Sequence, residues 1–214
     1  MEALSVTACF FPMSYDLPMS YHLPSGYQHR ANPVPHDDSE FTDEWQDEVY
    51  EAASLCCQCL HDRPTSVLDL GCGSAFKLLK HFSQPHVGVE VAPMIGVLRF
   101  SYPDMTWRHF DEGPTHADVV ICADVIEHVA DPDQILSFIE GCTPRLVFLS
   151  TPDRDLVGRP NGPPENKSHV REWTFAEFDD YLMKRGWLII EHYHSSRSQG
   201  TQLAVCEAIS PDTA

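Results

Sequence analysis

The chain has 214 residues, of which 43% are hydrophobic, and this is enough for one domain with a sizeable core. Its formal net charge of −18, from 14 basic and 32 acidic residues, repels polyanions and argues against nucleic acid, anionic membranes or coenzyme A esters as partners. The sequence contains no apolar run long enough for a transmembrane helix, so we expect no membrane span.

Residues 1–44 are predicted to form an N-terminal extension, and residues 45–214 the folded domain. The first 38 residues show no helical period, and five prolines interrupt regular structure there. A disordered tail is one interpretation of this composition. We favour an ordered segment that covers the binding cleft, because the extension is unusually aromatic, with Phe10, Phe11, Tyr15, Tyr21 and Tyr27.

A helix is predicted from about residue 45 to residue 60. Val49 and Ala53 lie on its apolar face, and acidic residues at its start suit the positive end of the helix dipole. No second cysteine pair lies at zinc spacing from the three cysteines of this helix, which are Cys56, Cys57 and Cys59. The eight cysteines of the chain are scattered, which is typical of a reduced, cytoplasmic protein.

Residues 66–82 predict a buried parallel strand, a glycine turn and a helix. The apolar run from Val67 to Leu70 leads into Gly71 and Gly73, and helix-favouring residues follow. A turn at the carboxyl end of a first strand is where α/β sheets bind nucleotide-like cofactors. Glycine is suited to it because a ligand can lie against backbone that carries no Cβ.

The turn differs from a dinucleotide fingerprint, because Lys77 and Leu78 occupy the region of the third glycine. Asp69, just before the first glycine, suits a cationic ligand better than a phosphate. The segment Asp-Leu-Gly-Cys-Gly resembles motif I of class I S-adenosylmethionine-dependent methyltransferases. The resemblance implies S-adenosylmethionine (SAM) as cofactor, held in part by Asp69, Gly71 and Gly73.

Two further acids follow at the spacing of successive βα units. A second strand ends at Glu90 and Val91, about twenty residues after the turn, where an acid binds ribose hydroxyls. A solvated strand-end carboxylate is the alternative for Glu90. A third strand is predicted to end at Asp111, and the resemblance implies that this carboxylate accepts a hydrogen bond from the adenine amino group.

The fourth predicted strand, residues 117–123, leads into Asp124-Val125-Ile126-Glu127-His128. This segment resembles the motif after strand four in many small-molecule and RNA methyltransferases, and Asp124 is expected at the cofactor. Later segments predict a fifth strand at 146–150, a polar loop at 153–168, a helix at 174–185 and two last strands. The fold expected is Rossmann-like α/β, with seven mostly parallel strands, one antiparallel strand and helices on both faces.

Methyl transfer from a sulfonium mainly requires an acceptor held in line, and a base helps if the acceptor must lose a proton. His128 is the first candidate base, because it is predicted at the start of a helix near the carboxyl edge of the sheet. A solvent-facing helix-start histidine is the alternative. His169, in the later polar loop, is the second candidate.

A metal site is a further hypothesis. Small-RNA 3′-end 2′-O-methyltransferases carry a Glu-x-x-Glu-His segment and a later histidine before Glu-Trp, and some ubiquinone-pathway O-methyltransferases are similar. Matched by position, the resemblance implies a divalent ion, such as Mn, Co, Zn or Mg, on Asp124, Glu127, His128 and His169. Aspartate replaces glutamate at the first position, and many relatives use no metal, so both alternatives stay open.

Five polar residues are predicted to contact the acceptor: Tyr27, Arg30, Arg159, Asn166 and Arg171. The loop and the N-terminal segment resemble a bacterial-type group of class I methyltransferases linked to sugar and secondary-metabolite pathways. We therefore predict methyl transfer to a small-molecule, sugar or natural-product acceptor, at oxygen. The alternatives are a metal-dependent RNA 3′-end 2′-O-methyltransferase and a non-catalytic SAM-fold subunit that supports a partner.

Overall fold

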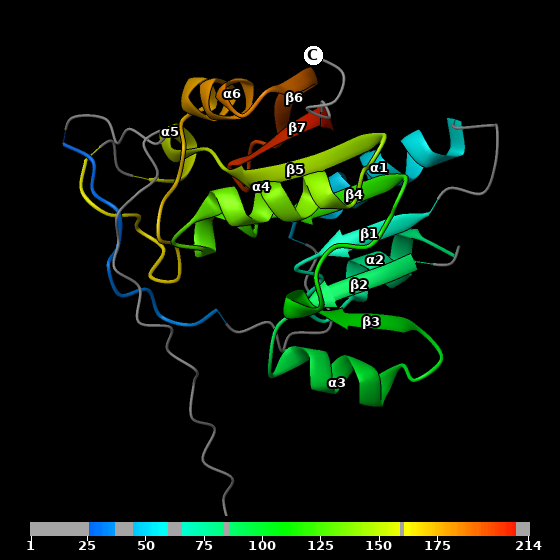
Figure 1. Cartoon of the computed structure of the whole chain (residues 1–214). Coiled ribbons are helices and arrows are strands. Elements are labelled where there is room, and N and C mark those ends of the chain that lie inside the picture. The colour runs from blue at the N-terminus through cyan, green and yellow to red at the C-terminus, as the bar shows by residue number, and fades with distance from the viewer. Residues whose placement is uncertain (1–25, 37–44, 60–65, 84–85, 159–160, 209–214) are drawn as a thin grey trace, which may run out of the picture.

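A single mixed sheet organises the computed structural model, which describes residues 26–36, 45–59, 66–83, 86–158 and 161–208 (Figure 1). The strand order is β3-β2-β1-β4-β5-β7-β6. The strands are β1 (Val67–Leu70), β2 (His86–Glu90), β3 (Thr106–His109), β4 (Val119–Ala123), β5 (Leu146–Pro152), β6 (Trp187–Ser196) and β7 (Thr201–Ala208). The first five pair in parallel, whereas β7 is antiparallel to both β5 and β6. The predicted seven-stranded fold is therefore confirmed.

Helices follow most strands of the sheet. They are α1 (Asp47–Cys59), α2 (Phe76–His81), α3 (Met94–Ser101), α4 (Pro132–Gly141), α5 (Arg154–Val157) and α6 (Phe175–Lys184), with 3-10 turns η1 (Phe110–Glu112) and η2 (Ile126–His128). Thr174 caps α6 in a capping box with Glu177, and Gly186, at φ +82°, follows its end. Within the described residues, no helix is both long enough and apolar enough to cross a membrane.

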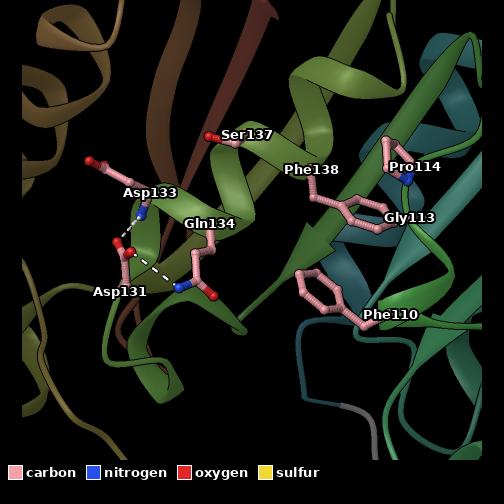
Figure 2. A pocket seen from close by; sticks show the side chains of 8 residues that line it. All are labelled: Phe110, Gly113, Pro114, Asp131, Asp133, Gln134, Ser137 and Phe138. Atoms are coloured by element: carbon pink, nitrogen blue, oxygen red, sulfur yellow. Dashed lines mark hydrogen bonds between the residues drawn. The ribbon is translucent and has the colours of Figure 1, made fainter. Parts of the chain in front are cut away.

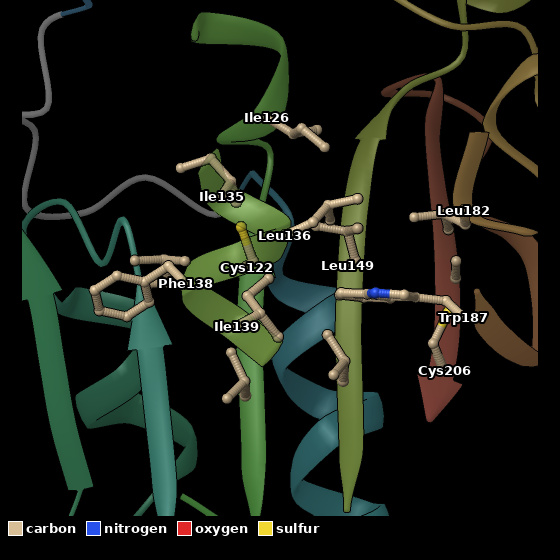
Figure 3. Packing of buried hydrophobic residues seen from close by; sticks show 14 of the residues in the cluster. Cys122, Ile126, Ile135, Leu136, Phe138, Ile139, Leu149, Leu182, Trp187 and Cys206 are labelled. Atoms are coloured by element: carbon tan, nitrogen blue, oxygen red, sulfur yellow. The ribbon is translucent and has the colours of Figure 1, made fainter. Parts of the chain in front are cut away.

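Apolar side chains fill both faces of the sheet. On one face, Leu136 and Ile139 of α4 and Leu182 of α6 meet residues of β4, β5 and β7 (Figure 3). On the other face, α1 packs on β4 and β5, next to α2, and α3 packs on β2 and β3, with Ala53 and Leu98 fully buried. Full burial of one such leucine or isoleucine contributes about 1.5–3 kcal/mol, so these layers fix the strand ends on which the site is built.

Three local predictions were wrong. The strand expected to end at Asp111 stops at His109, because η1 follows and its capping box is formed by His109 and Glu112. His128 lies in the 3-10 turn η2, and α4 begins only at Pro132, where Asp131 caps it. The polar loop expected from residue 153 contains the short helix α5, which is likewise capped by an aspartate. Side-chain caps on isolated turns are local signals that periodicity does not detect.

Candidate functional site

The glycine turn after β1 lies at the carboxyl edge of the sheet, as predicted. Gly71 and Gly73 both have positive φ, of +76° and +52°. The amide of Gly71 donates to the carbonyl of Val89 over 2.9 Å, which fixes the turn to β2. A Cβ on Gly71 would collide with Cγ2 of Val125. The glycine is therefore required by a neighbouring side chain as well as by its φ, and not only by the approach of a ligand.

Glu90, at the end of β2, folds back onto this turn. One carboxylate oxygen accepts from the amide of Gly73 over 2.8 Å, and the other accepts from the amide of Val91 over 2.7 Å. Glu90 is buried, whereas the side chain of Val91 is exposed. The structure thus brings together three of the residues predicted for the cofactor, and a solvated strand-end carboxylate does not describe Glu90.

Asp69 is buried beneath the turn and faces α1. The hydroxyl of Tyr50 donates to its carboxylate, with distances of 3.0 and 3.2 Å to the two oxygens. Burial raises the pKa of Asp69 to about 7, and the hydrogen bond from Tyr50 opposes this rise only in part. Sequence analysis missed Tyr50, because nothing in its apolar helix face indicates a polar partner.

Asp124, directly after β4, adopts a left-handed conformation with φ +51°. Its carboxylate accepts from the hydroxyl of Ser150 over 2.6 Å and from the side-chain amide of Gln46 over 3.0 Å. The backbone amide of Gln46 donates to the side-chain oxygen of Gln199 in the β6–β7 hairpin. Burial raises the pKa of Asp124. Gln46 was not predicted to contribute to the site. It connects the start of α1 with the segment after β4 and with the β6–β7 hairpin.

A second cluster is formed by Glu127, His128 and His169. One metal-ligating atom from each of these residues lies within 4.8 Å of the other two. Glu127 is fully buried; its Oε2 accepts from the hydroxyl of Thr151 over 3.0 Å, while its Oε1 has no hydrogen-bond partner and lies 4.0 Å from Nε2 of His128. Burial and the carboxylate of Asp124 raise the pKa of Glu127 well above its usual value. Asp124, the fourth predicted ligand, is not in the group.

Hydrogen bonds determine the tautomers of the two histidines. Nδ1 of His128 lies 3.1 Å from the carbonyl of Ser168, which can only accept, so Nδ1 carries the proton and Nε2 the lone pair. Nδ1 of His169 lies 2.7 Å from Glu172, and its Nε2 lies 2.9 Å from the amide nitrogen of Asn166. The neutral form of His169 therefore also presents its lone pair on Nε2. The two rings meet edge to face, with centroids 4.7 Å apart.

Two residues predicted to contact the acceptor instead hold the loop. The hydroxyl of Tyr27 accepts from the amide of Glu172 over 2.8 Å, and the guanidinium of Arg154 lies 4.2 Å from the centre of the Tyr27 ring. Arg30 donates to the carbonyl of Pro164. Tyr27 is buried, so in this structure it supports the wall of the site from behind.

The other predicted acceptor contacts are divided. Asn166 orients His169, as described above. Arg171 is buried, with its guanidinium 4.9 Å from the centre of the Trp173 ring. Arg159 lies outside the described residues. Asp111, predicted at the adenine, lies in η1 with 75% of its side chain exposed and makes no contact with the glycine turn that the structure records.

The three cysteines of α1 do not belong to the metal-ligating group. Cys56 and Cys57 are half-buried, Cys59 is exposed, and all three are free thiols. Within the described part of the chain, the group of Glu127 and the two histidines is the only set of side chains with metal-ligand geometry.

An open cavity is lined by residues of η1 and α4 and of the segments beside them (Figure 2). Phe110 and Phe138 stack across it with centroids 4.8 Å apart. The side chain of Asp131 closes its other end by accepting from the amide of Asp133 and the side chain of Gln134. None of the predicted site residues lines it, and we place the chemistry at the strand ends, where the buried acids and histidines gather.

Comparison with known proteins agrees with this architecture. A family model described as a methyltransferase domain matches residues 40–206. A search of curated proteins finds no match.

Solved structures with a similar fold include the Burkholderia thailandensis 1,6-didemethyltoxoflavin-N1-methyltransferase, with 19% identity, a TM-score of 0.58, and coverage of 85% of this chain and 94% of that one. The Synechocystis magnesium protoporphyrin IX methyltransferase has 15% identity and a TM-score of 0.57, over 75% and 78% of the two chains. The small RNA methyltransferase HEN1 has 19% identity and a TM-score of 0.54, over 84% of this chain and 28% of that one. At these identities the likeness concerns the fold.

Proposed function

This chain belongs to the methyltransferase domain family, and we propose that it transfers a methyl group from SAM to a hydroxyl of a small-molecule, sugar or natural-product acceptor. The observation that carries the proposal is the position of His128. Its Nε2 carries the lone pair and lies 4.0 Å from a buried carboxylate, at the same sheet edge as the glycine turn. A hydroxyl acceptor requires such a base.

The residues at the turn fit SAM. The carboxylate of Glu90 can accept hydrogen bonds from ribose hydroxyls, and in this structure it accepts from the amides of Gly73 in the turn and of Val91 after β2. The buried Asp69 and the half-buried Asp124 place acidic groups near the carboxyl ends of β1 and β4, which suits a cationic ligand. SAM supplies an activated methyl group on a sulfonium centre, and the chain has to hold and orient both partners.

The proton of the acceptor would pass to Nε2 of His128. The carbonyl of Ser168 holds the Nδ1 proton of the ring, so the orientation of His128 is fixed before the acceptor arrives. The nearby carboxylate of Glu127 stabilises the imidazolium that forms, as far as Glu127 is itself ionised. His169 completes the wall of the site, with Glu172 and Asn166 fixing its ring.

The net charge of −18 supports a neutral or cationic acceptor. An enzyme that binds RNA usually carries a basic track, and this chain has 14 basic residues against 32 acidic ones. Two of the cationic side chains near the site, Arg154 and Arg171, are buried. We therefore rank a small acceptor above RNA.

A metal-dependent RNA 3′-end 2′-O-methyltransferase is the second candidate. It is favoured by the unpartnered, buried Oε1 of Glu127 within a set of one carboxylate and two imidazoles. This donor set fits Mn, Co or Zn, and a bound ion would supply Lewis-acid activation of a hydroxyl. Glu127, His128 and His169 would hold it. Glu172 would orient His169 through Nδ1, and Asn166, which donates to Nε2 of His169 in this structure, would have to release that lone pair to the ion.

The test is a SAM-consumption screen over sugars, phenols, peptides and short RNAs, run with and without a chelator. Turnover with a hydroxylated small molecule is expected, and it should disappear in His128→Ala. Activity confined to RNA and abolished by the chelator would overturn the ranking and support the second candidate.

A non-catalytic subunit is the remaining alternative. Calorimetry with SAM distinguishes it, because a chain that only supports a partner need not bind the cofactor. We expect heat of binding at micromolar SAM, and no heat at millimolar SAM would favour the support role.

We also place the enzyme in the cytoplasm, since seven cysteines of the described chain are free thiols.

A further inference from the structure

A segment of the N-terminal extension, residues 26–36, lies along the loop before α6 and is called the strap below. Figure 1 shows it in blue beside the yellow part of the chain. Backbone amides of the strap donate to the loop at three points, from Gln28 to Gly162, from Arg30 to Val170 and from Val34 to Lys167, over 3.2, 2.7 and 2.9 Å. The loop is the one that carries His169, so the strap and this histidine are held in one unit.

The far end of the strap reaches the cluster. The ring of His36 lies against that of His128, with centroids 4.7 Å apart and planes inclined at 45°. His169 approaches His128 at the same centroid distance. His36 is exposed, so it covers His128 on the side that faces solvent.

From this contact we propose that His36 is a further imidazole ligand of a divalent-cation site at Glu127, His128 and His169, and that the cation fastens the strap to the domain. The inference rests on the metal binding considered under the second candidate function. It does not require that the acceptor be RNA. A cation on Nε2 of His128 would occupy the lone pair that otherwise takes the acceptor proton, so in the metal-bound form the ion would activate the acceptor in place of His128 as base.

The geometry of the cluster supports this assignment. Two imidazoles that bind one ion at about 2.0–2.1 Å have ring centroids about 5 Å apart, close to both observed distances. The group whose ligating atoms already lie within 4.8 Å of one another contains Glu127, His128 and His169 but not His36, so the His36 ring must turn toward the ion when it binds. Three protein ligands leave at least one coordination position open, which His36 can fill in place of water. The unpartnered Oε1 of Glu127, on a fully buried side chain, shows that the cluster itself lacks a positive or donating partner.

The direct test is titration of the full chain with cobalt(II) alone, followed by visible absorption. Wild-type protein should bind one ion, His169→Ala should lose binding, and His36→Ala should bind about tenfold more weakly with a changed spectrum. His116→Ala, an exposed histidine bonded to Thr143 far from the cluster, is the matched control and should behave as wild type.

The outcomes separate the two proposals. If wild-type protein fails to bind cobalt, the metal-dependent candidate fails and the role of His36 fails with it. If wild type binds cobalt and His36→Ala binds it with equal affinity and an identical spectrum, only the inference about His36 is overturned. Thermal unfolding without cobalt checks that His36→Ala is folded, as expected for an exposed position.

A second measurement reports on the strap itself. Trypsin can cut the chain after Arg30, within the strap, and cleavage requires the strap to detach. Cobalt should slow this cut in wild type by about tenfold and should leave the rate in His36→Ala unchanged. Equal protection of both proteins would show that the ion does not hold the strap through His36.

Discussion

The two halves of the site are assembled in different ways. The proposed cofactor half uses residues 69–73 and Glu90, which come from two successive β-strands and the glycine turn between them. The acceptor half draws on the strap, on the segment after β4 and on the loop before α6, which are far apart in the sequence. The first depends on local backbone geometry and the second on tertiary contacts. Mutations in the first half should therefore mainly change stability and SAM affinity, and mutations in the second half should mainly change turnover.

The largest effect is expected at the glycine turn. Gly71→Ala puts a Cβ onto Val125 and strains a residue at φ +76°, so we expect about 4 kcal/mol or more of lost stability and no measurable SAM binding. Chemical denaturation and calorimetry measure both. Gly186→Ala is the control, since its φ is +82° and nothing lies near its Cβ; it should cost about 1 kcal/mol. Equal losses in the two variants would show that the collision is unimportant.

Next in size is the base of the acceptor half. His128→Ala should lower kcat by about 10²–10⁴-fold while the Kd for SAM stays within about twofold, because the histidine acts on the acceptor proton. Single-turnover kinetics and calorimetry separate the two quantities. A parallel fall in both would remove His128 from this role. His116→Ala should change neither.

Asp69, in the cofactor half, should make the free energy of unfolding depend on pH. Its folded pKa of about 7 exceeds the usual value near 4, so the folded state holds this proton more tightly than the unfolded chain. The free energy of unfolding should therefore fall as pH rises from about 4 to 7 and stay level above, by at most about 4 kcal/mol from this group. Asp69→Asn should flatten this fall in urea denaturation at pH 5 and 8. Asp104→Asn, at an exposed position, should leave the fall unchanged.

Glu90 tests whether the cofactor half binds without supporting the fold. Glu90→Gln removes the charge and one of two amide contacts, and we expect the Kd for SAM to rise about 10–100-fold. Loss of one amide contact at this buried position should cost about 1–3 kcal/mol of unfolding free energy, compared with about none for Glu207→Gln, an exposed control on β7. Unchanged SAM affinity would show that Glu90 only braces the turn.

The smallest effect concerns the strap. Tyr27→Phe leaves the buried amide of Glu172 without its acceptor, which should cost about 1–2 kcal/mol of unfolding free energy. Turnover should fall less than tenfold, because His169 keeps its contacts with the side chains of Glu172 and Asn166. Tyr193→Phe on β6 is the matched control, because it removes the hydroxyl of an exposed tyrosine. A Tyr27 variant as stable as this control would show that the strap is not coupled to the loop.

The fold could be predicted because apolar runs ending in acids recur at βα spacing, and each of these runs became a strand. The contact between the glycine turn and Glu90 follows from the same pattern, whereas their role in cofactor binding stays a prediction. The prediction for Gly71 was incomplete, because its close neighbour is Val125, which lies in another segment. A side chain that faces a turn from a different strand leaves no mark in the local sequence.

The partners of the acids could not be predicted. Tyr50 and Gln46 reach Asp69 and Asp124 from the start of α1, and only the placement of that helix against the sheet brings them there. His36 has no periodic neighbours, and its position depends on backbone hydrogen bonds of the strap. Asp124 matched the metal motif by spacing, but its carboxylate is bound by Ser150 and Gln46.

The position of β7 has a consequence for synthesis of the chain. This last strand lies between β5 and β6, so β5 keeps an open edge until residues 201–208 have left the ribosome. A nascent chain that ends before that point exposes the apolar side of β5 and an unpaired ladder, which is a hazard for aggregation. Completion of the sheet therefore waits for the β6–β7 hairpin, and chaperone dependence should be greatest for chains that lack this hairpin.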